Sequence, residues 1–349
     1  MKKGFLKGIA LVLATVSLSC VTACGGAESS SDENAVEKVF LKAITGADAV
    51  GVMEADYFLL AQPAVGAQSK KGFTVKGDLQ TLYDEEKGGY PQAVLVGKKE
   101  IVENYAEWTA GFVASVRDAG AWLETASGEV IVSAVSSHME DEGTATSLKA
   151  PLLTADAVAG CGVRFAYASE YKTQISDFLA GMIAVNENSA KMPSDAFYWT
   201  GNSQTPTGGS MDKTVRVYMP DGAPALALAG LMANDTEEDG IEYNVVSASL
   251  IASKVTNKDE DKNADFCVLP ITAGSKLLGT GDRYKALGVV TQGNLYLIAK
   301  DGETITAENI SSLKGKTIGV LNINEVPGLT LKAVLNKYNI PFEEIRNDG

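Results

Sequence analysis

The sequence is poor in the residues that build metal centres and nucleophilic active sites. It contains a single histidine, His138, and four cysteines among 349 residues. One histidine excludes multi-histidine zinc sites and most Ser-His-Asp arrangements. After Cys24 only Cys161 and Cys267 remain, far apart and outside any CxxC pair, so they form either one disulfide or two separate buried thiols. We therefore expect no metal, no cofactor and no enzyme activity.

Basic residues are also scarce. Lysine and arginine number 30 against 44 aspartates and glutamates, which gives a formal charge of −14. Removing residues 1–23 would take away three lysines and no acid, so the charge would fall to about −17. Such a surface repels the phosphates of nucleic acids and anionic lipids. The composition therefore predicts no nucleic-acid partner.

The beginning of the chain has the pattern of a secretory signal. Three lysines in the first seven residues precede a short apolar run over 9–16, which is too short to span a bilayer. Val21-Thr22-Ala23-Cys24 resembles the bacterial lipobox, which implies cleavage after residue 23 and lipidation of Cys24. Residues 24–36 are rich in Gly, Ser and acidic residues, which suits a flexible tether. We expect an extracytoplasmic protein anchored to the cell membrane by lipid; the alternative is an ordinary signal peptide beside a cysteine.

The second half of the chain alternates apolar strands with helices. The pattern predicts strands at 214–219, 243–246, 264–269, 285–290, 295–299 and 316–321, and helices at 225–234, 250–255, from 273 onward and at 329–338. This alternation is typical of parallel βαβ units. The first half predicts a helix at 37–44, strands at 49–53, 56–61 and 93–96, and then helices at 101–123, 129–138, 155–161 and 169–183.

The order of these halves is unusual for one α/β chain. The sequence stops at 343–349, directly after a strand-like segment, and a parallel strand there needs a further crossover of a dozen or more residues, which the helix and strand predicted over 37–53 would supply. Residues 200–213 have the composition of a linker. Reading 213–349 before 37–200 restores strands followed by helices. We therefore expect a circularly permuted chain, and a merger of two incomplete tandem copies is the alternative.

In the restored order the chain resembles the extracytoplasmic solute-binding proteins of the nitrate, sulfonate and thiamine-precursor type. The matching segments are residues 215–232, 264–277, 284–299, 312–340, 55–65 and 90–123. The resemblance implies a periplasmic-binding-protein-like α/β fold of two lobes with mixed sheets and a hinge. It divides the chain into a signal peptide (1–23), tether (24–36), second part of lobe 2 (37–92), hinge strand and helices mainly of lobe 1 (93–200), linker (201–213), lobe 1 (214–299) and first part of lobe 2 (300–349).

Four turns after predicted strands are candidate ligand contacts. Backbone N–H groups at such turns and helix N-termini favour anions or acceptor atoms. The candidate residues in these turns are Asp221, Gly222, Ala223, Thr272, Thr291, Gln292, Gly293, Asn324, Val326, Gly328 and Thr330. Tyr57 and Tyr90 are candidates for stacking on a flat ligand, unless they belong to the core. The turns have a plainer alternative, as ordinary βα turns whose polar residues cap helices.

Gln62 is a further candidate because of the resemblance. The family usually has Glu-Pro where this chain has Gln62-Pro63. The change removes a charge beside the cleft and makes a cationic ligand less suitable. The resemblance thus implies a protein that delivers a small neutral or anionic molecule, such as a planar heterocycle or a sulfonate-like compound, to an ABC transporter permease. The alternatives are an enzyme of this fold acting on a pyrimidine or menaquinone precursor, and a sensory receptor.

Overall fold

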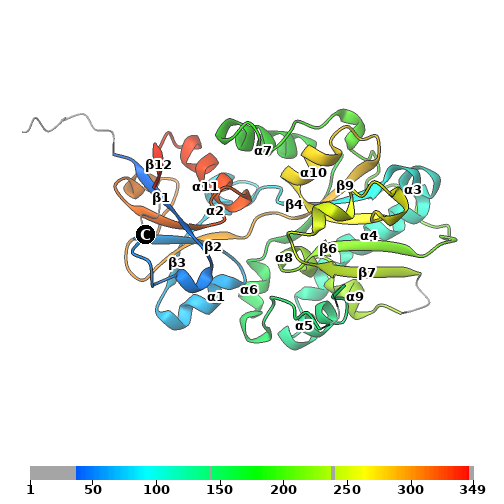
Figure 1. The fold of residues 1–349 in the computed structure, drawn as a ribbon, viewed down its shortest axis with the longest axis horizontal. Helices are drawn as coiled ribbons and strands as arrows, with labels where there is room; N and C mark the ends of the chain where they lie inside the picture. Colours follow the sequence, from blue (N-terminus) through cyan, green and yellow to red (C-terminus); the bar gives the residue numbers. More distant parts are fainter. Residues whose placement is uncertain (1–36, 142, 237–239, 346–349) are drawn as a thin grey trace, which may run out of the picture. The chain divides into compact units, whose positions relative to one another are not determined.

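The computed structural model describes residues 37–141, 143–236 and 240–345, which belong to one compact unit. The predicted signal peptide, the lipidation site Cys24 and the tether over 24–36 lie outside the described residues. The described chain forms two mixed six-stranded sheets with helices packed around them (Figure 1). We call them sheet A and sheet B.

Sheet A has the strand order β12-β1-β11-β2-β10-β3. Its strands are β1 (Val39–Ile44), β2 (Tyr57–Ala61), β3 (Thr74–Asp78), β10 (Leu295–Ala299), β11 (Thr317–Leu321) and β12 (Phe342–Ile345). The pairs β12–β1, β1–β11 and β11–β2 are parallel, and β10 is antiparallel to both of its neighbours. Its helices are α1 (Ala64–Gln68), α2 (Leu79–Tyr83) and α11 (Val326–Lys337).

Sheet B has the strand order β5-β9-β4-β8-β6-β7. Its strands are β4 (Ala93–Lys98), β5 (Val163–Tyr167), β6 (Val215–Pro220), β7 (Ile241–Val246), β8 (Phe266–Pro270) and β9 (Tyr284–Thr291). The helices that follow these strands are α3 (Lys99–Asn104), α4 (Ala106–Leu123), α5 (Gly128–Ser136), α6 (Ala155–Ala159), α7 (Lys172–Val185), α8 (Ala223–Leu226), α9 (Ala229–Ala233) and α10 (Ile271–Leu278).

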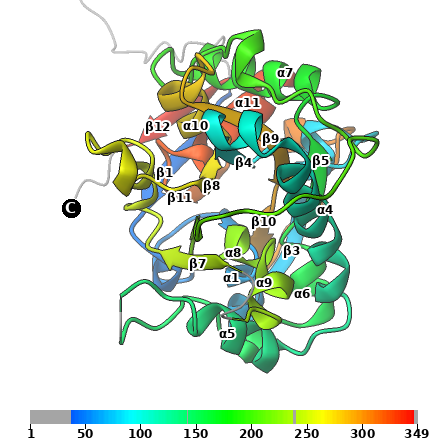
Figure 2. The same cartoon turned by 90° about the vertical axis from the view of Figure 1, so that its right-hand side faces the viewer.

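Alternation along β4 distributes its side chains between two cores. Val94 and Val96 face a core that contains Phe178 of α7, whereas Leu95 faces the core that contains Val113 of α4. Figures 1 and 2 show α7 on one side of sheet B and α5 and α9 on the other. The first core also includes sheet A residues and the buried side of α11, so one continuous apolar core extends over both sheets.

Two chain segments join the sheets within the described residues. Residues 84–92 lead from α2 to β4, and residues 292–294 lead from β9 to β10. We call them the crossing segments. We call the place where both segments pass the crossing point. It lies beside the carboxyl ends of β2, β8 and β9, because these ends pair with the first residues of β10 and β4.

Several local predictions need correction. The helix predicted at 37–44 is strand β1, and the strand predicted at 49–53 is a turn that follows a 3-10 helix (Ala47–Ala49). β1 lies between β12 and β11, so both of its edges are hydrogen-bonded, and a short apolar segment of this kind cannot be distinguished from a helix by periodicity. The 225–234 helix is interrupted between α8 and α9, and β3 and β5 were not predicted. Cys161 and Cys267 are two buried free thiols.

Candidate ligand-binding cleft

Five buried polar atoms at the crossing point have no hydrogen-bond partner in the structure. They belong to the residue that follows β2 and to residues of α2, the first crossing segment and β9: Gln62 Oε1, Gln80 Nε2, Tyr90 Oη, Gln92 Oε1 and Thr291 Oγ1. We call these five residues the crossing cluster. Because buried polar groups are nearly always hydrogen-bonded in folded proteins, several unpaired groups in one place indicate a site completed by a ligand or by water.

Asn294 in the second crossing segment holds part of this cluster together. Its side chain is 3% exposed. Its Nδ2 donates to the Gln62 carbonyl oxygen at 3.2 Å, and its Oδ1 accepts from Gln92 Nε2 at 3.0 Å. The Gln62 N–H donates to the Asn294 carbonyl oxygen at 2.9 Å. These contacts leave the two glutamine Oε1 atoms as unpaired acceptors.

Gly293 allows Tyr90 and Gln80 to approach the second crossing segment. Its φ is 86°, and a Cβ there would lie 2.8 Å from the Tyr90 ring and 2.9 Å from Gln80 Cγ. A side chain at this position is therefore excluded both by the left-handed backbone and by the neighbouring side chains. Gln80 Oε1 accepts from the Leu295 N–H at 2.8 Å, whereas its Nε2 makes no hydrogen bond of normal geometry to a described residue, although the Tyr296 side chain is close.

The crossing cluster contains no charged side chain. Burial, above all, raises the pKa of Tyr90; the Asn294 backbone, which is close to the phenol but does not meet hydrogen-bond geometry, lowers it in part, and nearby Asp78 raises it. The phenol therefore keeps its proton at neutral pH. Asp78 itself caps α2 by accepting from the Gln80 N–H at 2.8 Å. The cluster thus offers two amide acceptors, one amide donor and two hydroxyls.

The structure places Thr291, Gln292 and Gly293, which are candidates from one turn, at this crossing point. Gln292 differs from the cluster because its side chain is fully paired: Oε1 accepts from Tyr171 Oη at 3.1 Å and Nε2 donates to the Arg164 carbonyl oxygen at 3.3 Å. We therefore assign Gln292 to holding the segment in place.

Thr272 lies next to the cluster in the first turn of α10. The Ile271 N–H donates to the Gln92 carbonyl oxygen at 2.9 Å, which brings this turn to the first crossing segment. Thr272 is 7% exposed, and its hydroxyl has no hydrogen bond to any described residue. It is a further hydroxyl beside the crossing point.

Asp221, Gly222 and Ala223 connect β6 to α8. The Asp221 carboxylate accepts from the Thr146 hydroxyl at 2.5 Å, from the Ser147 N–H at 2.7 Å and from the Gly222 N–H at 2.9 Å. These bonds connect the carboxylate to the segment between α5 and α6 and to its own turn. Ala223 is buried as the first residue of the short helix.

Asn324, Val326, Gly328 and Thr330 lie together where β11 leads into α11. The Thr330 hydroxyl donates to the Val326 carbonyl oxygen at 2.7 Å. A Cβ on Gly328 would come 2.0 Å from the Ile323 carbonyl oxygen, so this glycine is needed for a close backbone approach. Asn324 is exposed. No hydrogen bond connects these four residues to the crossing cluster.

Tyr57 lies away from the crossing point. It is the first residue of β2, whereas Gln62 follows the last one, so the two are separated by roughly 15 Å along the strand. Tyr57 therefore does not share a site with Gln62, although both were predicted as ligand contacts.

Gln80, Gln92 and Asn294 are site residues that the sequence pattern did not reveal. Asn294 belonged to a predicted turn, but its role depends on Gln62 and Gln92, which are distant in sequence. No local signal marks Gln80 or Gln92.

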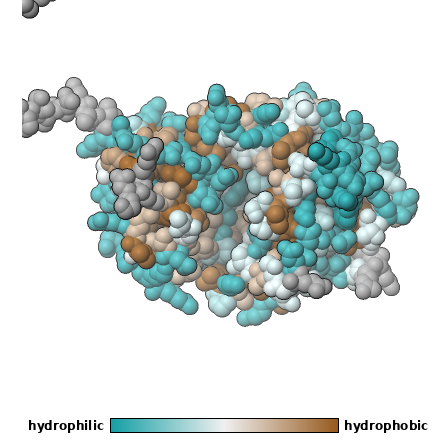
Figure 3. Space-filling view, in the orientation of Figure 1, coloured by the Kyte–Doolittle hydropathy of each residue, from teal (hydrophilic) through white to brown (hydrophobic). Residues whose placement is uncertain are grey.

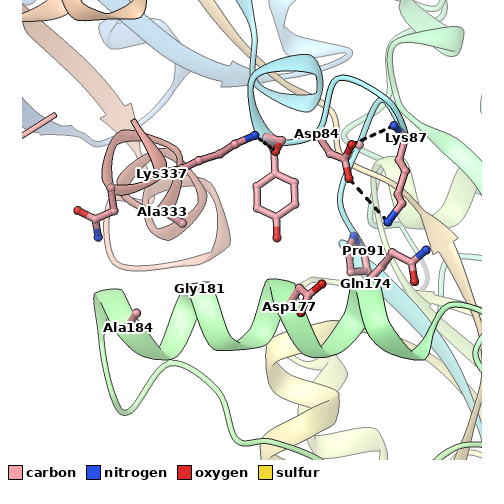
Figure 4. A pocket seen from close by; sticks show the side chains of 12 residues that line it. Asp84, Lys87, Pro91, Gln174, Asp177, Gly181, Ala184, Ala333 and Lys337 are labelled. Carbon is pink, nitrogen blue, oxygen red and sulfur yellow. Dashed lines mark hydrogen bonds and ion pairs between the residues drawn. The ribbon is translucent and has the colours of Figure 1, made fainter. Parts of the chain in front are cut away.

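The surface is hollowed between the parts that contain sheets A and B (Figure 3). A separate groove of about 480 Å³ lies between α7, α11 and the first crossing segment (Figure 4). There Gly181 of α7 faces Ala333 of α11, and a Cβ on Gly181 would be 3.8 Å from the Ala333 Cβ. None of the crossing-cluster residues lines this groove.

No protein-family model, no curated protein and no solved structure matches this chain. Over the described residues, none of the helices has the length and apolar character needed to cross a membrane. The same residues contain no group of three or more His, Cys, Asp or Glu side chains that could hold a metal ion.

Proposed function

We propose that this chain is an extracytoplasmic, lipid-anchored solute-binding protein that delivers a small neutral polar molecule to an ABC transporter permease. The observation that carries the proposal is the crossing cluster, where unpaired uncharged polar atoms meet at the two segments joining the sheets. Periplasmic-type binding proteins hold their ligand in such a place and close over it by hinge motion.

The chemistry of the cluster favours a neutral ligand with both donors and acceptors. Two unpaired amide oxygens call for N–H or O–H donors, and Gln80 Nε2 calls for an acceptor. An ion would lose its hydration without gaining a counter-charge from these side chains. A compound with an amide or a nitrogen heterocycle meets these requirements.

The first test is to identify what the protein retains. We expect native mass spectrometry of the purified chain to detect a small uncharged compound, and added compound to reduce the radius of gyration measured by small-angle X-ray scattering. A hundredfold excess of ligand over its dissociation constant stabilises a protein by about 2.7 kcal/mol. Absence of both compaction and a thermal shift across a broad metabolite panel would contradict the proposal.

A substitution at Thr291 separates binding from folding. Thr291→Val removes a hydroxyl that is buried and unpaired, so we expect a gain in stability of about 1 kcal/mol together with about tenfold weaker ligand binding. Chemical denaturation and calorimetric titration measure the two effects.

Thr109→Val is the matched control. Thr109 of α4 is also buried with an unpaired hydroxyl, but it lies outside the crossing point. We expect it to gain similar stability and to leave the affinity unchanged. Equal affinities of the Thr291→Val variant and the unsubstituted protein would remove Thr291 from the site.

We further propose that the chain is circularly permuted. The support is the parallel pairing of β12 with β1, which places strands from the two ends of the sequence side by side in sheet A. The described residues do not provide a crossover from Ile345 back to Val39, because the helix predicted at 37–44 is β1 itself. A merger of incomplete tandem copies therefore remains the alternative.

A re-permuted variant tests this idea. It begins at Gly209, ends at Gly208, omits residues 1–36 and joins residue 349 to residue 37 through about 15 Gly/Ser residues, enough for a crossover. We expect this variant to show the same circular dichroism spectrum and the same cooperative unfolding as the protein in its own residue order. A control with a two-residue junction should lose that cooperativity. Failure of the long-linker variant to fold would contradict the permutation.

A further inference from the structure

A second cavity, of about 680 Å³, lies at the end of sheet A where β2 begins. Its wall includes the aromatic residues Tyr57, Phe58 and Phe73. Phe58 and Phe73 meet edge to face, with ring centroids 5.7 Å apart. No crossing-cluster residue lines this cavity, so it is independent of the proposed cleft.

The cavity carries more negative than positive charge. Of its two lysines, Lys316 pairs with Asp56 at 3.7 Å and Lys300 lies 5.3 Å from the centre of the Phe73 ring. Three other carboxylates line the cavity without an ion pair to any described residue: Glu54, Asp301 and Glu303. The cavity is therefore lined by four carboxylates and two lysines, and this excess of negative charge favours the binding of a further cation.

Tyr57 is a largely buried residue that presents an unpaired hydroxyl to this cavity. Its side chain is 5% exposed, and its hydroxyl has no hydrogen bond to a described residue. Gly302, which also lines the cavity, has a φ of 97°, and a Cβ there would come 2.9 Å from the Tyr57 Oη. A glycine at this position therefore keeps the hydroxyl open to the cavity.

The hydroxyl is suited to accept a hydrogen bond from a cation. Burial first, and then the charges of Glu303 and Asp56, raise the pKa of Tyr57, so the phenol stays protonated and its oxygen keeps lone pairs free. Aromatic faces attract organic cations, as Lys300 over Phe73 already illustrates.

We propose that this cavity is a second binding site, which takes a small organic cation with a primary or secondary ammonium group. The ammonium N–H groups would donate to the Tyr57 oxygen and to Glu303 or Asp301, while the carbon chain contacts the aromatic wall. A bare metal ion fits less well, because the described residues hold no cluster of three metal ligands.

Spermidine is a suitable probe, titrated calorimetrically into the full chain at constant ionic strength. We expect one site, and about tenfold weaker binding to Tyr57→Phe, which removes one charge-assisted hydrogen bond. Tyr57→Phe keeps the charge and the ring, so non-specific attraction of a polycation to this acidic protein would not change.

Two further measurements control for charge and for metal binding. Glu303→Gln should weaken spermidine binding more than Glu187→Gln, which removes the same charge from an exposed residue outside the cavity. Magnesium chloride should bind without sensitivity to Tyr57→Phe. The proposal is overturned if spermidine does not bind, if Tyr57→Phe binds it unchanged, or if Glu187→Gln has the same effect as Glu303→Gln.

Discussion

A disulfide between α7 and α11 is expected to hold the two sheets in one arrangement. In the Gly181→Cys/Ala333→Cys variant the Cβ atoms would be 3.8 Å apart, the average separation in natural disulfides. Helix α7 follows β5 of sheet B in the chain, and α11 follows β11 of sheet A, so the bond would link one sheet to the other. Figure 4 shows the two positions facing each other.

We expect the oxidised variant to lose the ligand-dependent change in radius of gyration and to bind ligand at least tenfold more slowly. The bond closes a loop from residue 181 to residue 333, for which the chain-entropy model gives roughly 5 kcal/mol of added stability as an upper value. Scattering, stopped-flow binding and denaturation, each before and after reduction, measure these effects.

The two single-cysteine variants are the controls, and both should behave like the unsubstituted chain. Interference from the two native thiols of the described residues is small, because burial raises the pKa of the Cys161 thiol to about 12 and raises that of Cys267 further. If the oxidised double variant still compacts on binding ligand, then α7 moves together with sheet A, and closure does not pass through this contact.

Strands that are buried on both faces were largely predictable, and their partners were not. β6, β8, β9, β10 and β11 are near-continuous apolar segments beside turn residues, so each could be recognised locally. β1 is also a mostly apolar segment, but it is only partly buried and follows no turn signal, and it was predicted as a helix. Its strand conformation depends on β11 and β12, which lie some 300 residues away in the sequence.

The candidate site was predictable only where its residues belong to one turn. Thr291, Gln292 and Gly293 follow a clear strand, so their place at a sheet end could be predicted. Gln80 and Gln92 lie at the site because Leu295 and Asn294 bond to them across more than 200 residues. Pairing across such distances depends on sheet order, which a single sequence does not determine.

Asp265 is the second position where we expect a large effect. Its carboxylate is 2% exposed, lies 3.1 Å from Lys98 Nζ, and accepts from the Arg216 backbone N–H at 3.0 Å. Lys213 Nζ, at the end of the predicted linker, is 3.5 Å away. Asp265→Asn would leave the Lys98 ammonium, whose side chain is 11% exposed, without its nearest counter-charge. Loss of one partner from a buried ion pair costs about 3 to 5 kcal/mol.

The cost should depend on pH in a defined direction. Burial by itself raises the pKa of Asp265, but the hydrogen bonds from Arg216 and Lys98 and the charges of Lys98 and Lys213 outweigh it and lower that pKa. A carboxyl whose pKa is lower in the folded state stabilises the fold above its unfolded pKa of about 3.9, and this stabilisation is lost as the pH falls through the folded pKa. Urea denaturation should therefore show a large difference in the free energy of unfolding between the Asp265→Asn variant and the unsubstituted chain at pH 7 and a smaller one below pH 4.

Asp259→Asn is the control. It affects only an exposed pair with Lys262 at 3.4 Å, so it should change the free energy of unfolding by less than about 1 kcal/mol at either pH. A difference for Asp265→Asn that stays the same down to acidic pH would mean that its hydrogen bonds, and not its charge, hold the start of β8 to β4 and β6.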